Sequence, residues 1–347
     1  MRILVTGGAG FLGHHLVRLL LRQGHRVVVV DSLWTGNKGN IRSLEGHANF
    51  QYYICDVRDG FPELDGLDQI YHLACPASPD HFEVNPIEIL ETCFEGTKNA
   101  LELALKHGAR LLLTSTSETY GDPKVSPQAE TYRGNVSCFG PRACYDEGKR
   151  VAEALAYSYN KQQGVEVRIA RIFNAYGPYM KLDDGRAVPN FIAAAMERRP
   201  MVIYGDGTAT RSFQAARDCV AGLEKLMNSD YTGPVNIGSD REMTVGEMAS
   251  IIGRVVAKKM GHAEPVPVRC LPARQDDPMT RKPDITLARE KLGWKPLVEL
   301  EEGVDETVDW FLERRRLAKE DEEKEAARRQ VRPGRMAATA IGLDVSR

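Results

Sequence analysis

A tyrosine and a lysine four residues apart are the part of this sequence best suited to chemistry. Tyr145 and Lys149 lie in the segment CYDEGKR, and residues four apart on a helix share one face. Free tyrosine has a pKa near ~10, and a cation held beside it favours the phenolate. Such a pair can remove the proton of a hydroxyl group while a hydride leaves the same carbon. The spacing therefore predicts a site for proton and hydride transfer.

Three polar residues precede this pair and are placed to share its site. Thr116, Ser117 and Glu118 end the apolar run ARLLLTSTSE, which predicts a buried strand starting at residue 110. Glu118 has two readings, a catalytic carboxylate or a charged residue at the start of the next helix, where the dipole favours it. We favour the catalytic reading because Glu118 directly follows the strand that positions Thr116.

The hydride acceptor is predicted at the N-terminus, where a glycine-rich turn joins a strand at 1–6 to an amphipathic helix at 14–21. Gly7, Gly10 and Gly13 allow a tight turn and a close approach of backbone N–H groups to a pyrophosphate. A second strand at 26–30 ends in Asp31, which is placed to accept hydrogen bonds from ribose hydroxyls. That carboxylate would repel a 2′-phosphate, so the sequence favours NAD over NADP.

Two further strands carry polar residues at their carboxyl ends. Asp56 follows a strand at 50–54 and is read either as an acceptor for an adenine amino group or as a helix N-cap. A buried strand at 70–74 ends at Cys75 and Pro76. Because ligands bind at the carboxyl ends of parallel strands, we expect this segment to lie over the cofactor.

Composition narrows the class of protein. The net charge of −2 over 347 residues gives no overall case for nucleic-acid or membrane binding. No apolar stretch approaches the ~20 residues of a membrane span. The seven cysteines form no C-x-x-C pair, which argues against a zinc site or a disulfide framework. The sequence therefore predicts reduced thiols, no metal site and a cytoplasmic location.

Alternating strand and helix patterns extend to about residue 178. They predict an α/β fold, a Rossmann-type doubly wound parallel sheet with a smaller, interleaved C-terminal substrate lobe. We assign residues 1–178 and about 212–241 to the NAD-binding domain, with 234–237 as a strand that returns to the main sheet. The second lobe would comprise about 179–211 and 242–312. Residues 313–347 are predicted to form a charged helix and a disordered tail.

Several longer segments carry a family resemblance. HLACPASP, LLLTSTSETYGDP, GPRACYDEGKRVAE, ARIFNAYGP and QDDPMTRKPDI make residues 1 to about 312 resemble the extended short-chain dehydrogenase/reductases. Among these, the chain is most similar to the UDP-glucuronate decarboxylase family. The resemblance implies NAD as a catalytic cofactor, a UDP-sugar substrate and a homodimer built on the helices at 87–107 and 141–163.

The same resemblance implies a role for each site residue. Tyr145 would act as base on the sugar C4 hydroxyl, and Lys149 would lower its pKa and hold the nicotinamide ribose. The C4 ketone would allow CO₂ to leave, after which C5 is protonated and the hydride returns. Thr116 would bond the C4 oxygen, with Ser117 and Glu118 near C5. Arg281 would meet the substrate carboxylate or help to deliver the proton; its alternative is a surface ion pair with Asp276 or Asp277.

The implied binding residues form two groups. The cofactor would be held by Gly7, Gly10, Phe11, Leu12, Gly13, Asp31, Asn37, Asp56, Val57, Leu73, Ala74, Tyr145 and Lys149. The nucleotide sugar would be held by Pro76, Glu118, Asn174, Arg186, Tyr204, Arg211 and Arg281. An arginine fork suits a diphosphate because it donates two parallel hydrogen bonds.

The chain departs from the family pattern at a few positions. Cys93 stands where an asparagine is usual, Ala209 where a glutamine is usual, and Asn37 where an arginine is common. The usual Y-V-x-D segment reads 215–218 AARD here. Rival readings are a UDP-glucuronate 4-epimerase, a nucleotide-sugar 4,6-dehydratase, a variant that releases a 4-keto pentose, and a non-catalytic NAD-binding regulator. The dehydratase is disfavoured because an Asp-Glu pair usually follows its threonine, whereas Ser117-Glu118 stands here.

Overall fold

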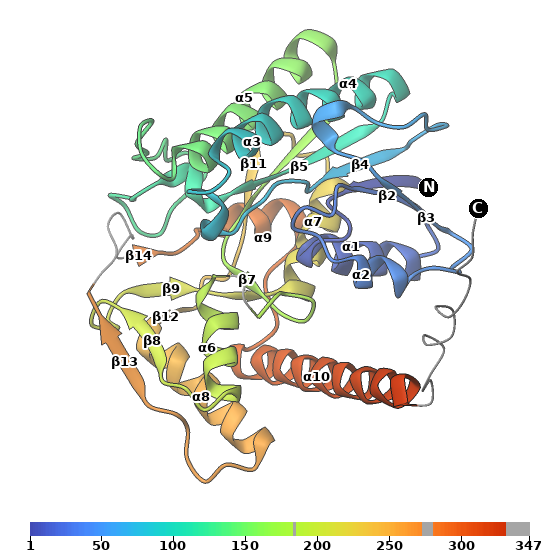
Figure 1. Ribbon diagram of the computed structural model, residues 1–347. Coiled ribbons are helices and arrows are strands. Elements are labelled where there is room, and N and C mark those ends of the chain that lie inside the picture. The colour runs from blue at the N-terminus through green and yellow to red at the C-terminus, as the bar shows by residue number, and fades with distance from the viewer. Residues whose placement is uncertain (183–184, 273–279, 331–347) are drawn as a thin grey trace, which may run out of the picture. The chain divides into compact units, whose positions relative to one another are not determined.

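The computed structural model describes residues 1–182, 185–272 and 280–330 (Figure 1). The chain divides into two compact units, Met1–Val308 and Asp309–Arg347, and the site lies in the first. Within the described residues, no helix is both long and apolar enough to cross a membrane. The predicted disordered tail falls mostly on residues 331–347, which lie outside the described part of the chain.

A parallel sheet forms the centre of the first unit. Its described strands run in the order β11-β6-β5-β4-β1-β2-β3, and each neighbouring pair is parallel. The interior strands are rich in Val, Ile and Leu because helices cover both faces. The strands are β1 (Arg2–Thr6), β2 (Arg26–Asp31), β3 (Phe50–Ile54), β4 (Gln69–His72), β5 (Arg110–Thr116), β6 (Val167–Ile172) and β11 (Pro234–Ile237).

Two groups of helices bury the two faces of this sheet. Apolar side chains of α1, α7 and α9 share one core with the sheet, and those of α4 and α5 share another (Figure 1). The Rossmann-type doubly wound sheet predicted from the sequence is confirmed, including β11 as a strand that returns to the sheet. The helices are α1 (Phe11–Arg22), α2 (Lys38–Arg42), α4 (Thr97–His107), α5 (Ala143–Gln163), α7 (Ala216–Met227) and α9 (Thr286–Leu292).

The helix predicted at 87–107 is not one regular helix. It begins as α3 (Pro86–Glu91), widens into one π-helical segment, η3 (Thr92–Gly96), and continues as α4. Such wide turns occur frequently at functional sites. The hydrophobic period alone did not reveal it, because an extra residue in one turn shifts the pattern only slightly. Short 3₁₀ helices follow three of the strands, η1 (Val57–Asp59), η2 (Pro79–His81) and η4 (Ser117–Tyr120).

Smaller sheets and two further helices come after β6 in sequence and supply the remaining residues of the site. β9 pairs with β12 and β14, β8 pairs with β13, and β7 pairs with β10. Their bounds are β7 (Ala175–Tyr176), α6 (Ala187–Met196), β8 (Met201–Tyr204), β9 (Thr210–Ser212), β10 (Gln214–Ala215), β12 (Glu242–Thr244), α8 (Val245–Met260), β13 (Val268–Leu271) and β14 (Thr280–Arg281). The last described helix, α10 (Leu300–Gln330), begins thirteen residues before the expected charged segment at 313.

Candidate active site

One cavity of about 700 Å³ is lined by every residue that the sequence analysis assigned to cofactor, substrate or catalysis. It lies at the carboxyl ends of the sheet strands. There the chain leaves the neighbouring strands β1 and β4 toward opposite edges of the sheet, to β2 and to β5. Its volume falls in the range of small-molecule sites. The structure therefore brings the expected residues together, and their individual roles stay predictions.

The glycine turn after β1 fits a pyrophosphate. Gly7 has φ near +70°, and a Cβ added at Gly13 would lie 2.0 Å from the Gly7 carbonyl oxygen, so neither position accepts a side chain. Among the described side chains none caps the N-terminus of α1 at Gly10. Because Gly10, Phe11 and Leu12 line the cavity, this helix end offers backbone N–H groups to an anion.

The carboxylate at the end of β2 holds the glycine turn and still faces the cavity. Asp31 is 7% exposed and accepts hydrogen bonds from the backbone N–H groups of Ala9 (2.9 Å) and Leu33 (2.8 Å). Each carboxylate oxygen retains a second lone pair, so both can accept from ribose hydroxyls. The dinucleotide thus fits the residues present at this end.

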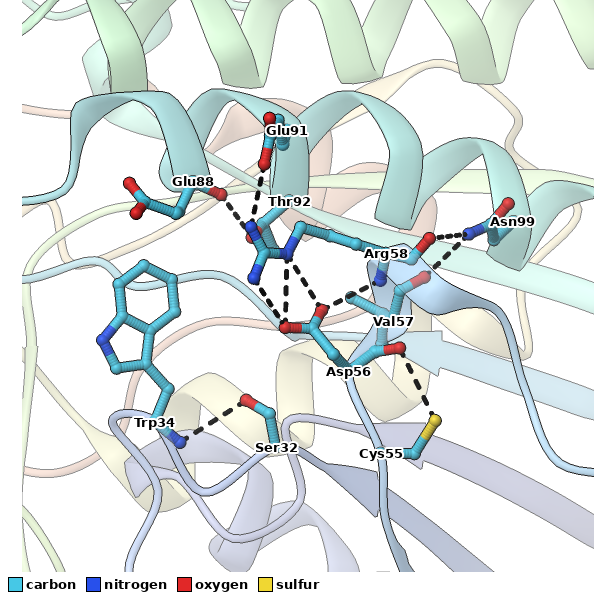
Figure 2. A network of polar contacts seen from close by, with 10 residues as sticks. All are labelled: Ser32, Trp34, Cys55, Asp56, Val57, Arg58, Glu88, Glu91, Thr92 and Asn99. Carbon is cyan, nitrogen blue, oxygen red and sulfur yellow. Dashed lines mark hydrogen bonds and ion pairs between the residues drawn. The ribbon is translucent and has the colours of Figure 1, made fainter.

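Asp56 lies in a polar network at the far end of the same cavity (Figure 2). Its carboxylate accepts from the backbone N–H of Arg58 at 2.9 Å, so it caps η1, and it also accepts from the Arg58 guanidinium. Figure 2 shows that guanidinium between Asp56 and Glu91 of α3, with a 2.8 Å contact to Glu91. The N-cap reading is therefore present in the structure. The adenine contact stays a prediction, since the same carboxylate also lines the cavity.

Tyr145 and Lys149 lie on one face of α5 beside the end of β5. Lys149 Nζ donates to the Thr114 carbonyl oxygen at 2.9 Å and lies 5.8 Å from the centre of the Tyr145 ring. The Thr116 side chain lies close enough to Tyr145 to favour its phenolate. Phe82 stacks on the tyrosine ring with centroids 5.0 Å apart. Strand β5 and helix α5 thus bring together the hydroxyl groups of Thr116 and Tyr145 and the ammonium group of Lys149.

Burial decides the protonation state of this pair. Burial raises the pKa of Tyr145 well above its usual value, while the charge of Lys149 and the nearby Thr116 side chain oppose the rise. Lys149 acts in the expected direction, but the expected net lowering of the Tyr145 pKa is not found in this structure. Desolvation outweighs a single cation because it penalises the phenolate directly. Lys149 remains charged, since nearby Cys75 and Tyr145 raise its pKa against the effect of burial.

Glu118, two residues after Thr116, is held by two arginines. Arg281 forms a two-pronged ion pair with it, with contacts of 2.5 and 3.0 Å, and Arg142 donates to it at 2.6 Å. Burial opposes ionisation of Glu118, yet Arg281 and Arg142 lower its pKa on balance. Glu118 is therefore an ionised carboxylate. Asp276 and Asp277, the alternative partners considered for Arg281, lie outside the described residues.

The sequence analysis missed two members of this cluster. Arg142 is the N-cap residue of α5, and Asp146 follows Tyr145 in the chain, with 3.6 Å between Arg142 Nε and Asp146 Oδ2. Asp146 is 6% exposed, and its Oδ1 has no hydrogen-bond partner among the described residues. Burial and the charge of Glu118 raise its pKa to about 7. The i, i+4 spacing of Arg142 and Asp146 was the available signal.

The opposite wall of the cavity carries groups suited to a diphosphate. Arg186 is the N-cap residue of α6, and no described side chain forms a capping hydrogen bond there. Arg211 on β9 and Tyr204 on β8 line the same wall, together with Asn174 after β6. A helix N-terminus flanked by guanidinium groups attracts phosphate oxygens. Pro76 and Ser117 complete the lining close to Thr116.

Comparison with known proteins agrees with this geometry. Residues 4–307 match a family model described as GDP-mannose 4,6 dehydratase. UDP-glucuronic acid decarboxylase 1 of Danio rerio is 52% identical over 310 residues, covering 89% of this chain and 72% of the relative.

Two solved structures share the fold. A dTDP-glucose 4,6-dehydratase from Streptomyces venezuelae, solved with NAD, is 28% identical with a TM-score of 0.79 and covers 91% of this chain and 98% of its own. A mutant UDP-glucuronic acid 4-epimerase from Bacillus cereus, solved with NAD and a fluorinated UDP-glucuronic acid, is 27% identical with a TM-score of 0.78. That alignment covers 90% of this chain and 99% of the other. The chain therefore belongs to this family of extended short-chain dehydrogenase/reductases, with UDP-glucuronic acid decarboxylases among its relatives.

Proposed function

We propose that this protein is an enzyme that converts UDP-glucuronate to UDP-xylose with NAD as a catalytic cofactor. The observation that carries the proposal is the arrangement around Thr116. Tyr145 and Lys149, which suit proton removal at C4, line the same cavity as Thr116 and as Glu118 with its ion-pair partner Arg281. The sequence identity of about half with a UDP-glucuronic acid decarboxylase supports the same substrate.

The cofactor is NAD, which when bound accepts a hydride from C4 and later returns it. The first turn of α1, from Gly10 to Gly13, would hold its pyrophosphate, and Asp31 its adenine ribose. Asn37, Asp56 and Val57 would surround the adenine. Leu73 and Ala74 would contact the nicotinamide side, with Lys149 on that ribose.

Tyr145 and Thr116 handle the oxygen at C4. Tyr145 takes the hydroxyl proton as the C4–H bond is broken, and Thr116 donates a hydrogen bond to the forming ketone. Lys149 stabilises the phenolate that burial otherwise disfavours. The ketone lies β to the C6 carboxylate, so CO₂ leaves with its bonding electrons remaining on an enolate. Reprotonation at C5 and hydride return to C4 complete a redox-neutral cycle.

The Glu118 cluster handles C5 and the departing carboxylate. Glu118 is ionised and therefore accepts a proton from water or orients it. Arg281, bound to Glu118, would meet the substrate carboxylate, and Ser117 lines the same cavity. On the far wall, Arg186, Arg211, Tyr204 and Asn174 would bind the UDP group, with Pro76 against the sugar.

Product analysis tests the proposal. The purified protein is incubated with UDP-glucuronate and NAD⁺, and the products are resolved by chromatography and mass spectrometry. We expect a UDP-pentose lighter than the substrate by one CO₂ molecule. A product of unchanged mass that coelutes with UDP-galacturonate would instead identify an epimerase. A UDP-4-keto pentose with stoichiometric reduced cofactor would identify the leaky variant. The absence of any conversion despite NAD binding would favour the regulator.

A homodimer is part of the proposal. Apolar side chains remain exposed on α3, η3 and α5, namely Ile87, Leu90, Phe94, Val151 and Tyr157. Their spacing along the α3–η3 segment places three of them on one helical face, as in paired helices. Sedimentation should give a dimer. An Ile87→Asp variant should shift it toward monomer, whereas Val268→Asp, an exposed apolar position on β13, should not.

We also propose a cytoplasmic location. Each of the seven cysteines is a free thiol in the structure, in keeping with a reducing compartment. Fractionation of the native cells with an antibody to the protein tests this; recovery in an oxidising compartment would contradict it.

A further inference from the structure

Two thiols meet at the edge of the active-site cavity. Cys75 follows β4, between Ala74 and Pro76, and lines the cavity. Cys93 lies in the π-helical segment η3 and is 2% exposed. Their sulfur atoms are 3.4 Å apart, and both cysteines are free. The catalytic cycle proposed above uses neither thiol.

The surroundings make Cys75 the more reactive of the two. A hydrogen bond from Cys93 and the nearby Lys149 ammonium lower the pKa of Cys75 to about 7. Contact with Cys75 and burial raise the pKa of Cys93, so that thiol keeps its proton. A partly exposed thiolate beside a cation is the form that reacts with oxidants. The pair thus consists of an attacking sulfur and a resolving sulfur.

We propose that Cys75 and Cys93 form a reversible disulfide that switches the enzyme off under oxidising conditions. Hydrogen peroxide supplies the oxidising equivalent. The Cys75 thiolate attacks one peroxide oxygen, an S–O bond forms, the O–O bond breaks, and hydroxide takes up a proton to leave as water. Cys93 then loses its proton and attacks the Cys75 sulfur, displacing the second oxygen as water. One peroxide thus converts two thiols to one disulfide and two waters. A dithiol reductant reverses the reaction.

Closing the bond must move part of the site. The sulfurs would approach from 3.4 Å to the about 2.0 Å of a disulfide. Cys93 has little room on the α5 side, because a Cβ added at Gly148 would lie 3.0 Å from Cys93 Cβ and 3.1 Å from its sulfur. Gly148 directly precedes Lys149. The shift therefore falls on α5 beside Lys149, on η3, or on the Cys75 segment that carries Ala74 and Pro76.

The disulfide also changes the charge beside Lys149. It removes the Cys75 thiolate. While present, that thiolate favours the charged form of Lys149 and disfavours the phenolate form of Tyr145. A displacement of about 1 Å in a catalytic group can cost about 100-fold in rate. We therefore expect turnover to fall by about that factor on oxidation. The loss of turnover rests on the proposed function, whereas formation of the bond does not.

Peptide mapping separates the pair from the other cysteines. No lysine or arginine lies between residues 59 and 97, so one tryptic peptide, 59–98, contains Cys75 and Cys93 and no other cysteine. Glutamates at 83, 88 and 91 lie between the two cysteines, so a glutamate-specific protease leaves their fragments joined only by a disulfide. The reduced full-length protein is treated with hydrogen peroxide, alkylated without reductant, and digested in both ways.

After peroxide treatment, we expect peptide 59–98 to carry no alkyl group on either cysteine. Its mass should be two hydrogen atoms below that of the unalkylated reduced peptide. Turnover should fall in step with this change and return with dithiothreitol. A Cys93→Asn variant should keep its turnover after a brief peroxide treatment that inactivates the wild type. A Cys144→Ser variant should respond as the wild type does, because the Cys144 thiol donates to backbone oxygens, such as that of Phe82 at 3.8 Å.

Three results would overturn the inference. One is oxidation of Cys75 to a sulfinic acid without linkage to Cys93. Another is a Cys75–Cys144 bond. The third is the expected bond with unchanged turnover. If the reduced protein fails to decarboxylate UDP-glucuronate, the proposed function fails, and the peptide map still decides whether the disulfide forms.

Discussion

The two sides of the catalytic cavity handle protons by opposite physical means. At the hydride side, Tyr145 is packed against Phe82, and burial raises its pKa even though Lys149 is close. At the carboxylate side, the Glu118 side chain is also largely enclosed, with 14% of it exposed, but two arginines lower its pKa. Desolvation dominates where one cation faces one phenol, and ion pairing dominates where two guanidinium groups hold one carboxylate. Within one cavity, the structure thus keeps one acid protonated and the other ionised.

This difference suits two proton transfers that run in sequence. Tyr145 is protonated in this structure, because burial outweighs the nearby Lys149. Glu118 is ionised, because Arg281 and Arg142 are bound to it. Pairs of titratable groups whose environments separate their pKa values are a general sign of divided acid–base roles.

Removal of the Tyr145 hydroxyl should have the largest effect on activity. Tyr145→Phe keeps the ring that stacks on Phe82 and loses the group that moves the C4 proton. We expect kcat to fall by about 1,000-fold, within the range for general acid–base groups. NAD affinity should change by less than about tenfold, since at most one neutral hydrogen bond is lost. Steady-state kinetics and calorimetric titration with NAD measure the two quantities.

A matched Tyr157→Phe variant provides the control, because Tyr157 is an exposed tyrosine on the same helix. Its turnover should equal that of the wild type. Turnover of Tyr145→Phe within tenfold of the wild type would remove Tyr145 as the base.

Neutralising Glu118 should separate the two sides of the cavity. Glu118→Gln keeps the size of the side chain but leaves Arg281 and Arg142 without their anion. We expect an overall rate loss of about 100-fold, while the hydride of C4-deuterated substrate still reaches the cofactor. Mass spectrometry of the recovered dinucleotide detects this deuterium. If Glu118→Gln blocks deuterium transfer as fully as Tyr145→Phe does, the two sides do not act separately.

The nucleotide-binding half of this site follows directly from local sequence signals. The turn that requires Gly7 and Gly13 can be predicted from a short sequence motif, because its geometry depends on residues close together in the chain. The i, i+4 spacing of Tyr145 and Lys149 likewise reports one helix face. The parallel sheet follows from the alternation of strands and helices, because strands joined by helical crossovers run in one direction.

Contacts between distant segments were harder to predict. Glu118 and Arg281 are 163 residues apart, so their two-pronged geometry depends on how β14 packs beside β9. The approach of Cys75 to Cys93 depends on the π-helical turn, which an apolar period does not reveal. The net rise of the Tyr145 pKa also depends on burial by Phe82, a residue in a different segment.

Arg142 should have a smaller, pH-dependent effect on the carboxylate side. Arg142→Gln removes one of the two cations that lower the pKa of Glu118, so that pKa rises. The acidic limb of the kcat/KM profile should therefore move to higher pH. We expect a loss of about tenfold on that limb, the size of one charge-assisted hydrogen bond, and little loss on the alkaline side. Arg142→Lys should restore most of the profile. An unshifted limb in Arg142→Gln would show that Arg281 alone sets the charge of Glu118.

Replacing Asp146 should have the smallest effect on activity and the clearest effect on the free energy of unfolding. Burial and the nearby Glu118 raise its pKa from 3.8 to about 7, while Arg142 and Arg281 oppose the rise. The folded protein therefore holds a proton there that the unfolded chain releases, and this group lowers stability as the pH rises from about 4 to about 7. Asp146→Asn removes that cost. The stabilisation by Asp146→Asn should grow by at most about 2 to 3 kcal/mol between about pH 5 and about pH 8.

Chemical unfolding of wild type and variant at the two pH values measures this difference, and turnover should change by less than about threefold. Glu147→Gln, one residue along α5 and outside the cavity, is the matched control and should show no such pH dependence. A stabilisation that shrinks toward alkaline pH would mean that Asp146 is ionised in the folded protein. Arg142 would then be shared between two ionised carboxylates, Glu118 and Asp146, and the carboxylate side of the cavity would carry one more negative charge.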